Sequence, residues 1–236
     1  MIILACESST LLGSVAVFEN SKLIAYKESL RQGSHSDVLN LFVEQVLATT
    51  NLKISDIDLF ISGIGPGSFT GIRISITTIK TFAYCFDKPV LGINSLENLA
   101  WQYCLQCDDE KKPIISMINA YKNMVYIATY KKENSQLVTL KEPEVVRVQN
   151  LDQYITEAAI CVGDGYTTYS KYFNSTLNGL ITRPSFPEDD PKASAAAYFV
   201  NHKNLKSFHW SLLLPLYLRA SEAEENLNGI KFQPLE

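Results

Sequence analysis

The chain has 236 residues, of which 46% are hydrophobic and 19% charged, and its formal net charge is −4. This composition supplies enough apolar surface for a packed core and excludes a disordered chain. The length suits one large domain or two domains of roughly 110 residues each. An acidic chain without a basic stripe is not expected to bind nucleic-acid phosphates by itself. Any nucleic-acid function would therefore need a partner to supply positive charge.

The first apolar run, Ile2 to Cys6, is followed directly by Glu7. It has neither the basic region nor the length of a signal peptide. Nowhere do about 18 apolar residues run together, so no membrane-spanning helix is expected. The five cysteines are irregularly spaced, which is typical of reduced thiols. We therefore expect a cytoplasmic protein that does not bind membranes.

The first hundred residues predict three strands in a meander, followed by helices that alternate with two further strands. Ser34 or Ser36 is expected to cap the first helix, and Ser68 the second. This order is that of an RNase H-like α/β domain with a mixed sheet between helices. The expected strands are 2–6, 14–18, 23–26, 59–62 and 90–93, and the expected helices are 36–48, 69–86 and 95–103.

The pattern then begins again. The stretch 19–28 recurs as 133–142, and both stretches start with Glu-Asn-Ser. Ile2-Ile3 and Ala16 have counterparts in Ile114-Ile115 and Ala128, and the glycine turn that ends 158–165 matches the one that ends 59–65. Three matches in the same order predict a duplicated domain. We expect domains at 1–108 and 113–236, with a tail that could pack back on the first, and a short helix at 194–200.

A glycine-rich turn, residues 65–71, lies between an expected strand and the start of an expected helix. Such a turn can bind an anion, but no P-loop lysine follows and the spacing is not that of a dinucleotide fingerprint. Close packing of helix and sheet explains the glycines equally well, and we favour it. Glu7 and Ser68 are the candidate contacts for an anion or nucleotide, although Glu7 could instead cap the turn after its strand.

The sequence contains no strong motif for a metal site or for a catalytic nucleophile. The histidines at 35, 202 and 209 have no helical pairing, and the single C-x-x-C at 104–107 has no second pair. No G-x-S-x-G elbow occurs. We therefore predict no catalytic and no metal-binding residues in this chain.

The first two long helices carry more apolar or small residues than one sheet contact requires. The surplus could dock helices of another chain, or the chain's own C-terminal segment could cover it. The predicted partner interface is Val38, Leu41, Phe42, Gly71, Ile74, Ser75, Thr78 and Phe82.

Several motifs resemble the bacterial TsaB family, also called YeaZ, and the resemblance covers nearly the whole chain. The most specific is Gly-Pro-Gly-Ser-Phe-Thr-Gly at 65–71, and others lie at 2–9, 89–96, 163–165 and 215–219 with an acid at 222 or 224. The resemblance implies two tandem RNase H-like domains of the actin/Hsp70/sugar-kinase (ASKHA) type. It also implies a scaffold or activator role in forming threonylcarbamoyladenosine in the anticodon loop of tRNA.

The resemblance further implies a catalytic TsaD-like partner, a TsaE-like ATPase, tRNA contact only through the complex, and a homodimer when the chain is alone. In the catalytic relatives, two histidines of Asn-His-Leu-Glu-Gly-His bind metal, whereas this chain has Ser95 and Leu99 at those positions. Metal and ATP or ADP are therefore expected to belong to the partners, and the isolated chain is expected to carry no cofactor. Asn119 and Tyr121 replace the family's usual Asp and Arg, and Glu7 replaces its usual aspartate.

There are two alternative hypotheses for the function. The chain could be a nucleotide-dependent small-molecule kinase or a metallopeptidase-like enzyme of the same superfamily, which would bind ATP or metal tightly by itself. A self-sufficient RNA-binding module is disfavoured by the acidic composition.

Overall fold

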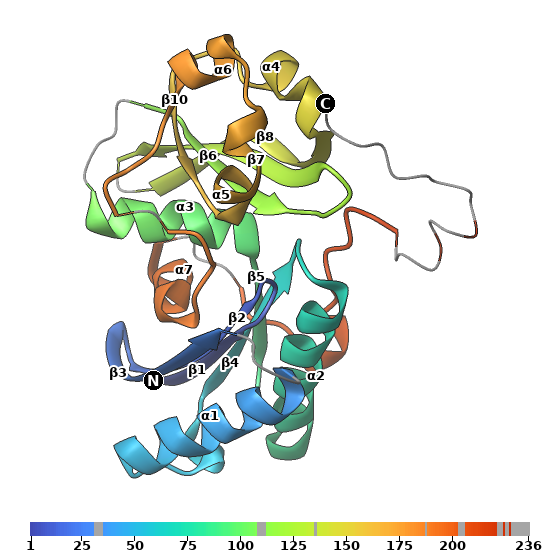
Figure 1. The fold of residues 1–236 in the computed structure, drawn as a ribbon. Helices are drawn as coiled ribbons and strands as arrows, with labels where there is room; N and C mark the ends of the chain where they lie inside the picture. The colour runs from blue at the N-terminus through green and yellow to red at the C-terminus, as the bar shows by residue number, and fades with distance from the viewer. Residues whose placement is uncertain are drawn as a thin grey trace. The chain divides into compact units, whose positions relative to one another are not determined.

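The computed structural model describes residues 1–30, 35–107, 112–134, 136–186, 188–202 and 206–220, together with 224 and 227. The chain forms two compact units, each built around its own five-stranded sheet (Figure 1). Unit 1 comprises Met1–Asn98 and Pro191–Leu216, and unit 2 comprises Leu99–Asp190 and the described residues of the tail from Tyr217 onward. We call Pro191–Leu216 the return segment.

The observed division differs from the expected domains 1–108 and 113–236. The first unit ends at Asn98, inside a helix, and the return segment leaves the second half of the chain to join it. Residues 108–111, in the expected boundary, lie outside the described residues, and so do Ser34, Ser135 and Glu222.

In unit 1 the sheet order is β3-β2-β1-β4-β5, with β1 antiparallel to β2 and parallel to β4. The mixed sheet matches the predicted RNase H-like order. The elements are β1 (Ile2–Glu7), β2 (Leu12–Glu19), β3 (Lys22–Leu30), α1 (His35–Thr50), β4 (Leu59–Gly65), α2 (Phe69–Phe86), β5 (Val90–Asn94) and α3 (Ser95–Gln106).

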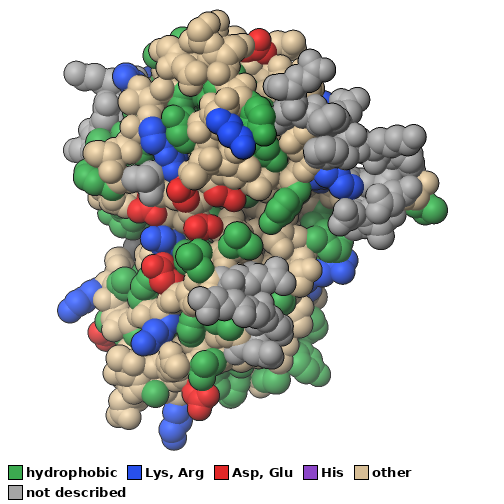
Figure 2. All heavy atoms as spheres, viewed as in Figure 1, with side chains coloured by type: hydrophobic (Ala, Val, Ile, Leu, Met, Phe, Trp, Pro, Cys, Tyr) green, Lys and Arg blue, Asp and Glu red, His purple; other side chains and the backbone are tan. Residues whose placement is uncertain are grey.

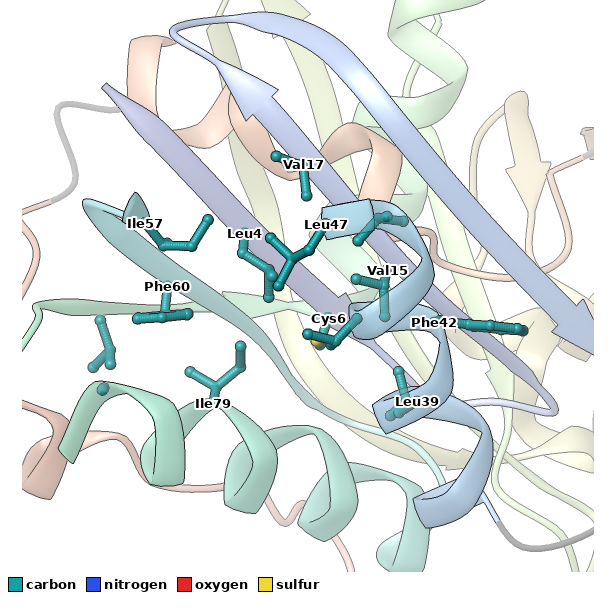
Figure 3. Close-up of a cluster of buried hydrophobic side chains, with 14 of the residues drawn as sticks. Leu4, Cys6, Val15, Val17, Leu39, Phe42, Leu47, Ile57, Phe60 and Ile79 are labelled. Atoms are coloured by element: carbon teal, nitrogen blue, oxygen red, sulfur yellow. The ribbon is translucent and has the colours of Figure 1, made fainter. Parts of the chain in front are cut away.

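Both faces of the unit 1 sheet are covered, which explains why β1 is a continuous apolar run. Side chains of α1 and α2 pack on one face against Leu4, Cys6 and Phe60 (Figure 3). The helix α7 (Ala196–His202) and the 3-10 turn before it also contact β1 and β2. Their buried side chains are alanines and Phe199. Since neighbouring side chains of a strand point to opposite faces, Ile3 and Ala5 face away from α1 and α2.

Unit 2 repeats this topology. Its sheet order is β10-β9-β6-β7-β8, again with an antiparallel meander and a parallel strand beside its first member. The elements are β6 (Ile114–Asn119), β7 (Met124–Glu133), β8 (Gln136–Arg147), α4 (Leu151–Tyr154), β9 (Ala159–Val162), α5 (Asp164–Tyr169), α6 (Ser175–Leu180) and β10 (Ile181–Thr182).

The predicted repeat falls on equivalent hairpins. Residues 19–28 span the β2–β3 turn and most of β3, and the described residues of 133–142 span the end of β7 and the first half of β8. Asn20 and Asn134 hold the same left-handed backbone, at φ 56° and 50°. Asparagine tolerates this conformation better than most residues. The duplicated α/β fold predicted from the sequence is therefore confirmed. Among the described residues, no helix is both long and apolar enough to cross a bilayer.

Candidate functional site

A groove of about 740 Å³ lies between α1 and α2 on unit 1. Its lining comes almost wholly from one face of α2, where positions three or four residues apart fall in line. The lining residues are Asn40, Thr70, Arg73, Ile74, Thr77, Thr78, Thr81 and Phe82. The groove therefore combines hydroxyl groups and a guanidinium with two apolar side chains.

Three of the predicted interface residues line this groove: Ile74, Thr78 and Phe82. Two more lie on α1, where Leu41 is 48% exposed and Val38 is half-buried against the core. These five have surface that another chain could reach.

The other three predicted interface residues are buried, and the prediction is corrected for them. Phe42 lies among the core side chains drawn in Figure 3. The Oγ of Ser75 lies 2.9 Å from the Ser62 Oγ and 3.0 Å from the Cys6 carbonyl oxygen, to which it donates. A Cβ added to Gly71 would lie 1.9 Å from the Ser8 carbonyl oxygen. Small residues on this face of α2 therefore let the helix approach its own sheet.

Arg73 was missed by the sequence analysis. Its guanidinium lies 3.9 Å from the centroid of the Phe69 ring, one turn earlier on α2. Stacking on an aromatic ring restricts a flexible side chain, which places a positive charge at one end of the groove. The available signal was the helical spacing of Arg73 with Thr70 and Thr77, but polar residues on an exposed face rarely identify a site.

The glycine-rich turn is packed tightly against the turn after β1. The Ser68 N–H donates to the Ser9 carbonyl oxygen at 2.6 Å, and the Ser68 hydroxyl accepts from the Gly71 N–H at 3.3 Å. A Cβ on Gly67 would lie 2.1 Å from the Ser9 carbonyl oxygen. Ser68 is thus the predicted N-cap of α2, and the glycines serve the close packing favoured by the sequence analysis.

Glu7 is turned into the protein at the end of β1. Its carboxylate accepts from the Ser9 N–H at 2.8 Å and from the Ser95 hydroxyl at 3.1 Å. Burial raises the pKa of the Glu7 carboxyl above its ordinary value, although hydrogen bonds from Ser9, Ser95 and Ser8 act in the opposite direction. The side chain therefore does not present its charge to a ligand in this structure.

In the equivalent turn of unit 2, backbone N–H groups are also hydrogen-bonded within the chain. The Gly163 N–H donates to the Glu188 carbonyl oxygen at 2.7 Å, and the Asp164 N–H donates to the Asp189 carbonyl oxygen at 2.9 Å. Both glycine turns thus use backbone N–H groups internally that an anion would otherwise need.

The model of the family described as "TsaD: tRNA N6-adenosine threonylcarbamoyltransferase" matches residues 29–183. Two curated relatives are each described as "tRNA threonylcarbamoyladenosine biosynthesis protein TsaB". The one from Bacillus subtilis is 26% identical over 95% of this chain and 96% of its own length, and the one from Escherichia coli is 27% identical over 97% and 99%. The chain belongs to the TsaB (YeaZ) branch of the TsaD family. A solved structure described as YeaZ from Pseudomonas aeruginosa shares the fold, with a TM-score of 0.76 at 21% identity over 92% of this chain and 99% of that one.

The chain thus has two α/β units with the same order of strands, in agreement with the duplicated fold that the resemblance implied. Its residues do not fit the metal that the resemblance implies for catalytic TsaD relatives. Leu99 is fully buried and has no ligand atom, and Ser95 donates its hydroxyl proton to Glu7. Among the described residues, no group of three or more His, Cys, Asp or Glu side chains is placed to hold a metal ion.

Proposed function

We propose that this chain is a non-catalytic subunit that binds a TsaD-like catalytic protein through the α1–α2 groove and activates it for threonylcarbamoyladenosine formation on tRNA. The observation that carries the proposal is the groove itself, about 740 Å³ in volume and lined by Ile74, Thr78 and Phe82. A groove with apolar and small polar residues between two helices suits a helix of another chain.

Polar groups at the ends of β1 and β9 are bonded within the chain, which supports the non-catalytic part of the proposal. Glu7 is buried against Ser95, and the N–H groups of Gly163 and Asp164 are bound by the chain's own carbonyls. In this proposal metal and ATP or ADP are held by the partners, which include a TsaE-like ATPase. The chain contacts tRNA only within the complex, works in the cytoplasm, and pairs with a second copy when it is alone.

The groove is tested by placing a charge in it. Ile74→Asp and Thr78→Arg are each expected to weaken binding to the TsaD-like subunit by at least about tenfold, because a buried unpaired charge is costly at an interface. The matched control is Leu23→Asp, which places the same charge on an exposed apolar position of β3. Thermal unfolding of each variant checks that unit 1 remains folded.

Activity is measured by reconstituting the tRNA modification with the partner subunits, with and without this chain. We expect loss of product when the chain is omitted or carries Ile74→Asp, and retention with Leu23→Asp. If both groove variants bind the partner as tightly as the wild type does, the interface lies elsewhere on the chain. Tight ATP or metal binding by the isolated chain in calorimetry would favour a kinase or metallopeptidase-like enzyme instead.

A further inference from the structure

Three consecutive acidic residues, Glu188, Asp189 and Asp190, lie across the start of α5 in unit 2. We call them the acidic clasp. Two of their backbone carbonyls accept from the N–H groups of Gly163 and Asp164, at 2.7 and 2.9 Å. Acidic side chains gather over α3 and α5 on the face drawn in Figure 2. The clasp therefore brings negative charge to the place where β9 passes into α5.

Side chains from three other elements also hold the clasp. Gln102 of α3 donates to the Glu188 carboxylate at 2.9 Å and to the Asp190 carbonyl oxygen at 3.0 Å. Arg183, after β10, forms an ion pair with Asp189, and the Thr167 hydroxyl of α5 donates to the same carboxylate. These side-chain contacts hold the clasp in addition to its two backbone hydrogen bonds with Gly163 and Asp164.

Asp164 is a partly buried carboxyl group at the first position of α5. Burial, together with the charges of Asp190 and Asp189, raises the pKa of the Asp164 carboxyl to about 7, while the N–H of Asn119 acts in the opposite direction by donating to the carboxylate at 2.8 Å. The side chain thus changes charge in the neutral range beside the clasp, to which the Asp164 backbone N–H is itself hydrogen-bonded.

We propose that Asp164 and the acidic clasp form a pH-dependent latch, closed on α5 when Asp164 is protonated and loosened when Asp164 is ionised. The reason is repulsion between like charges that share a partly desolvated site. The closed form binds a proton that the open form releases, so closure is favoured in acid and weakens as pH rises through the neutral range.

The other groups around Asp164 do not reverse this sign. From β6 it meets Asn119, which is uncharged, and on α5 Tyr169 donates its hydroxyl to the same Asn119 side chain. The guanidinium of Arg183 is engaged with Asp189 and with the Cys161 carbonyl oxygen. Arg219 donates to the Ala120 carbonyl oxygen. Glu188, the remaining member of the clasp, adds negative charge.

The test is hydrogen exchange on the full chain, read at the Gly163 and Asp164 amides. Their protection, corrected for the intrinsic effect of pH, is expected to fall about tenfold between about pH 6 and about pH 8.5 if the open carboxyl regains an ordinary pKa. Asp164→Asn should make protection independent of pH. Asp190→Asn should reduce the change, because it removes one of the repelling charges.

The matched control is Asp152→Asn, which removes an exposed carboxylate on α4 of the same unit and should keep the wild-type profile. Constant protection of the wild-type amides across this range would overturn the latch. So would the same fall in protection in Asp164→Asn. If Asp164→Asn does not fold, the wild-type profile and the Asp190→Asn profile still decide between the two outcomes.

Discussion

At the scale of single residues, the lack of a side chain at Gly63 lets the Glu7 carboxylate pack directly against β4. A Cβ on Gly63 would lie 2.1 Å from the Glu7 Oε2. We expect Gly63→Ala to lower the free energy of unfolding by about 1–3 kcal/mol through overpacking. The obstacle is a side chain, so adding Glu7→Ala should recover part of that loss. A denaturant double-mutant cycle measures the coupling.

Gly71 provides the comparison for this cycle. The atom that a Cβ there would meet is the Ser8 carbonyl oxygen, at 1.9 Å. Since no side-chain truncation removes a backbone oxygen, Gly71→Ala should stay destabilising in combination with Ser8→Ala. Additive losses for Gly63→Ala and Glu7→Ala would contradict the packing described for the Glu7 carboxylate.

Glu7 also predicts a dependence of stability on pH. Burial raises the folded-state pKa of its carboxyl, so the folded chain binds more protons than the unfolded chain above the unfolded value of about 4.3. The contribution of Glu7 to the free energy of unfolding therefore falls as pH rises through the folded pKa. Glu7→Gln, which retains an acceptor for the Ser9 N–H, should gain stability relative to the wild type in urea titrations as pH rises above the unfolded-state pKa. A constant difference between the two proteins would contradict this sign.

Sequence patterns identified some residue roles and missed others for a clear reason. Ser68 was predicted as a cap because a cap depends on a hydroxyl residue just before a helix, which is local information. Phe42, Gly71 and Ser75 were assigned to a surface because they surround a helical stripe. Their burial depends on how closely α1 and α2 approach the sheet. The inward turn of Glu7 depends on Ser95, which lies 88 positions away.

At the scale of elements, the return segment completes the edge and the core of unit 1. Phe208 and Val90 exchange two backbone hydrogen bonds of 3.0 Å, so the segment pairs with the edge strand β5. Trp210 contacts Tyr84 of α2 edge to face, with ring centroids 5.2 Å apart. Leu213 enters the core with α1 and α2 residues. An edge that is paired in this way is protected from joining other chains.

Two neighbouring leucines test that role. Leu213 is 1% exposed and Leu214 is 66% exposed. We expect Leu213→Ala to reduce the free energy of unfolding by about 2–5 kcal/mol, as a buried leucine does, and Leu214→Ala to change it by less than about 0.5 kcal/mol. Equal effects in chemical denaturation would mean that the return segment does not contribute to the core.

Element boundaries in the first half were predicted closely, and α2 was predicted to the residue, because long amphipathic helices and apolar strands have strong periodic signals. The second half was harder. The repeat predicted a second sheet, but α4, α5 and α6 are only four to six residues long. Such short helices have too few turns for a hydrophobic period, so tertiary packing decides where they form.

At the scale of the whole molecule, the duplicated fold and the family could be predicted from the sequence, whereas the expected boundary near residue 110 does not coincide with the division between the two units. A charged, proline-containing stretch near residue 110 is typical of a linker. The actual division runs through α3 and makes unit 1 discontinuous. The tail was expected to be able to pack back on the first domain, and Pro191–Leu216 belong to unit 1.

Discontinuity leads to a prediction about fragments. A fragment of residues 1–108 lacks α7, Leu213 and the Phe208 bridge to β5, so it should show no cooperative thermal unfolding. Fusing residues 191–216 to it through a flexible linker should restore a cooperative transition, measured by circular dichroism. A sharp transition in the shorter fragment would contradict the role given to the return segment.

The return segment also has a consequence for how the chain is made. Roughly a hundred residues lie between β5 and this segment, so at about 5–20 residues per second a ribosome needs about 5–20 s to add the missing face after the first sheet has been synthesised. During that interval one apolar side of a nascent sheet has no cover. The chain is therefore expected to depend on holding chaperones during translation more than a protein whose domains follow one another along the sequence.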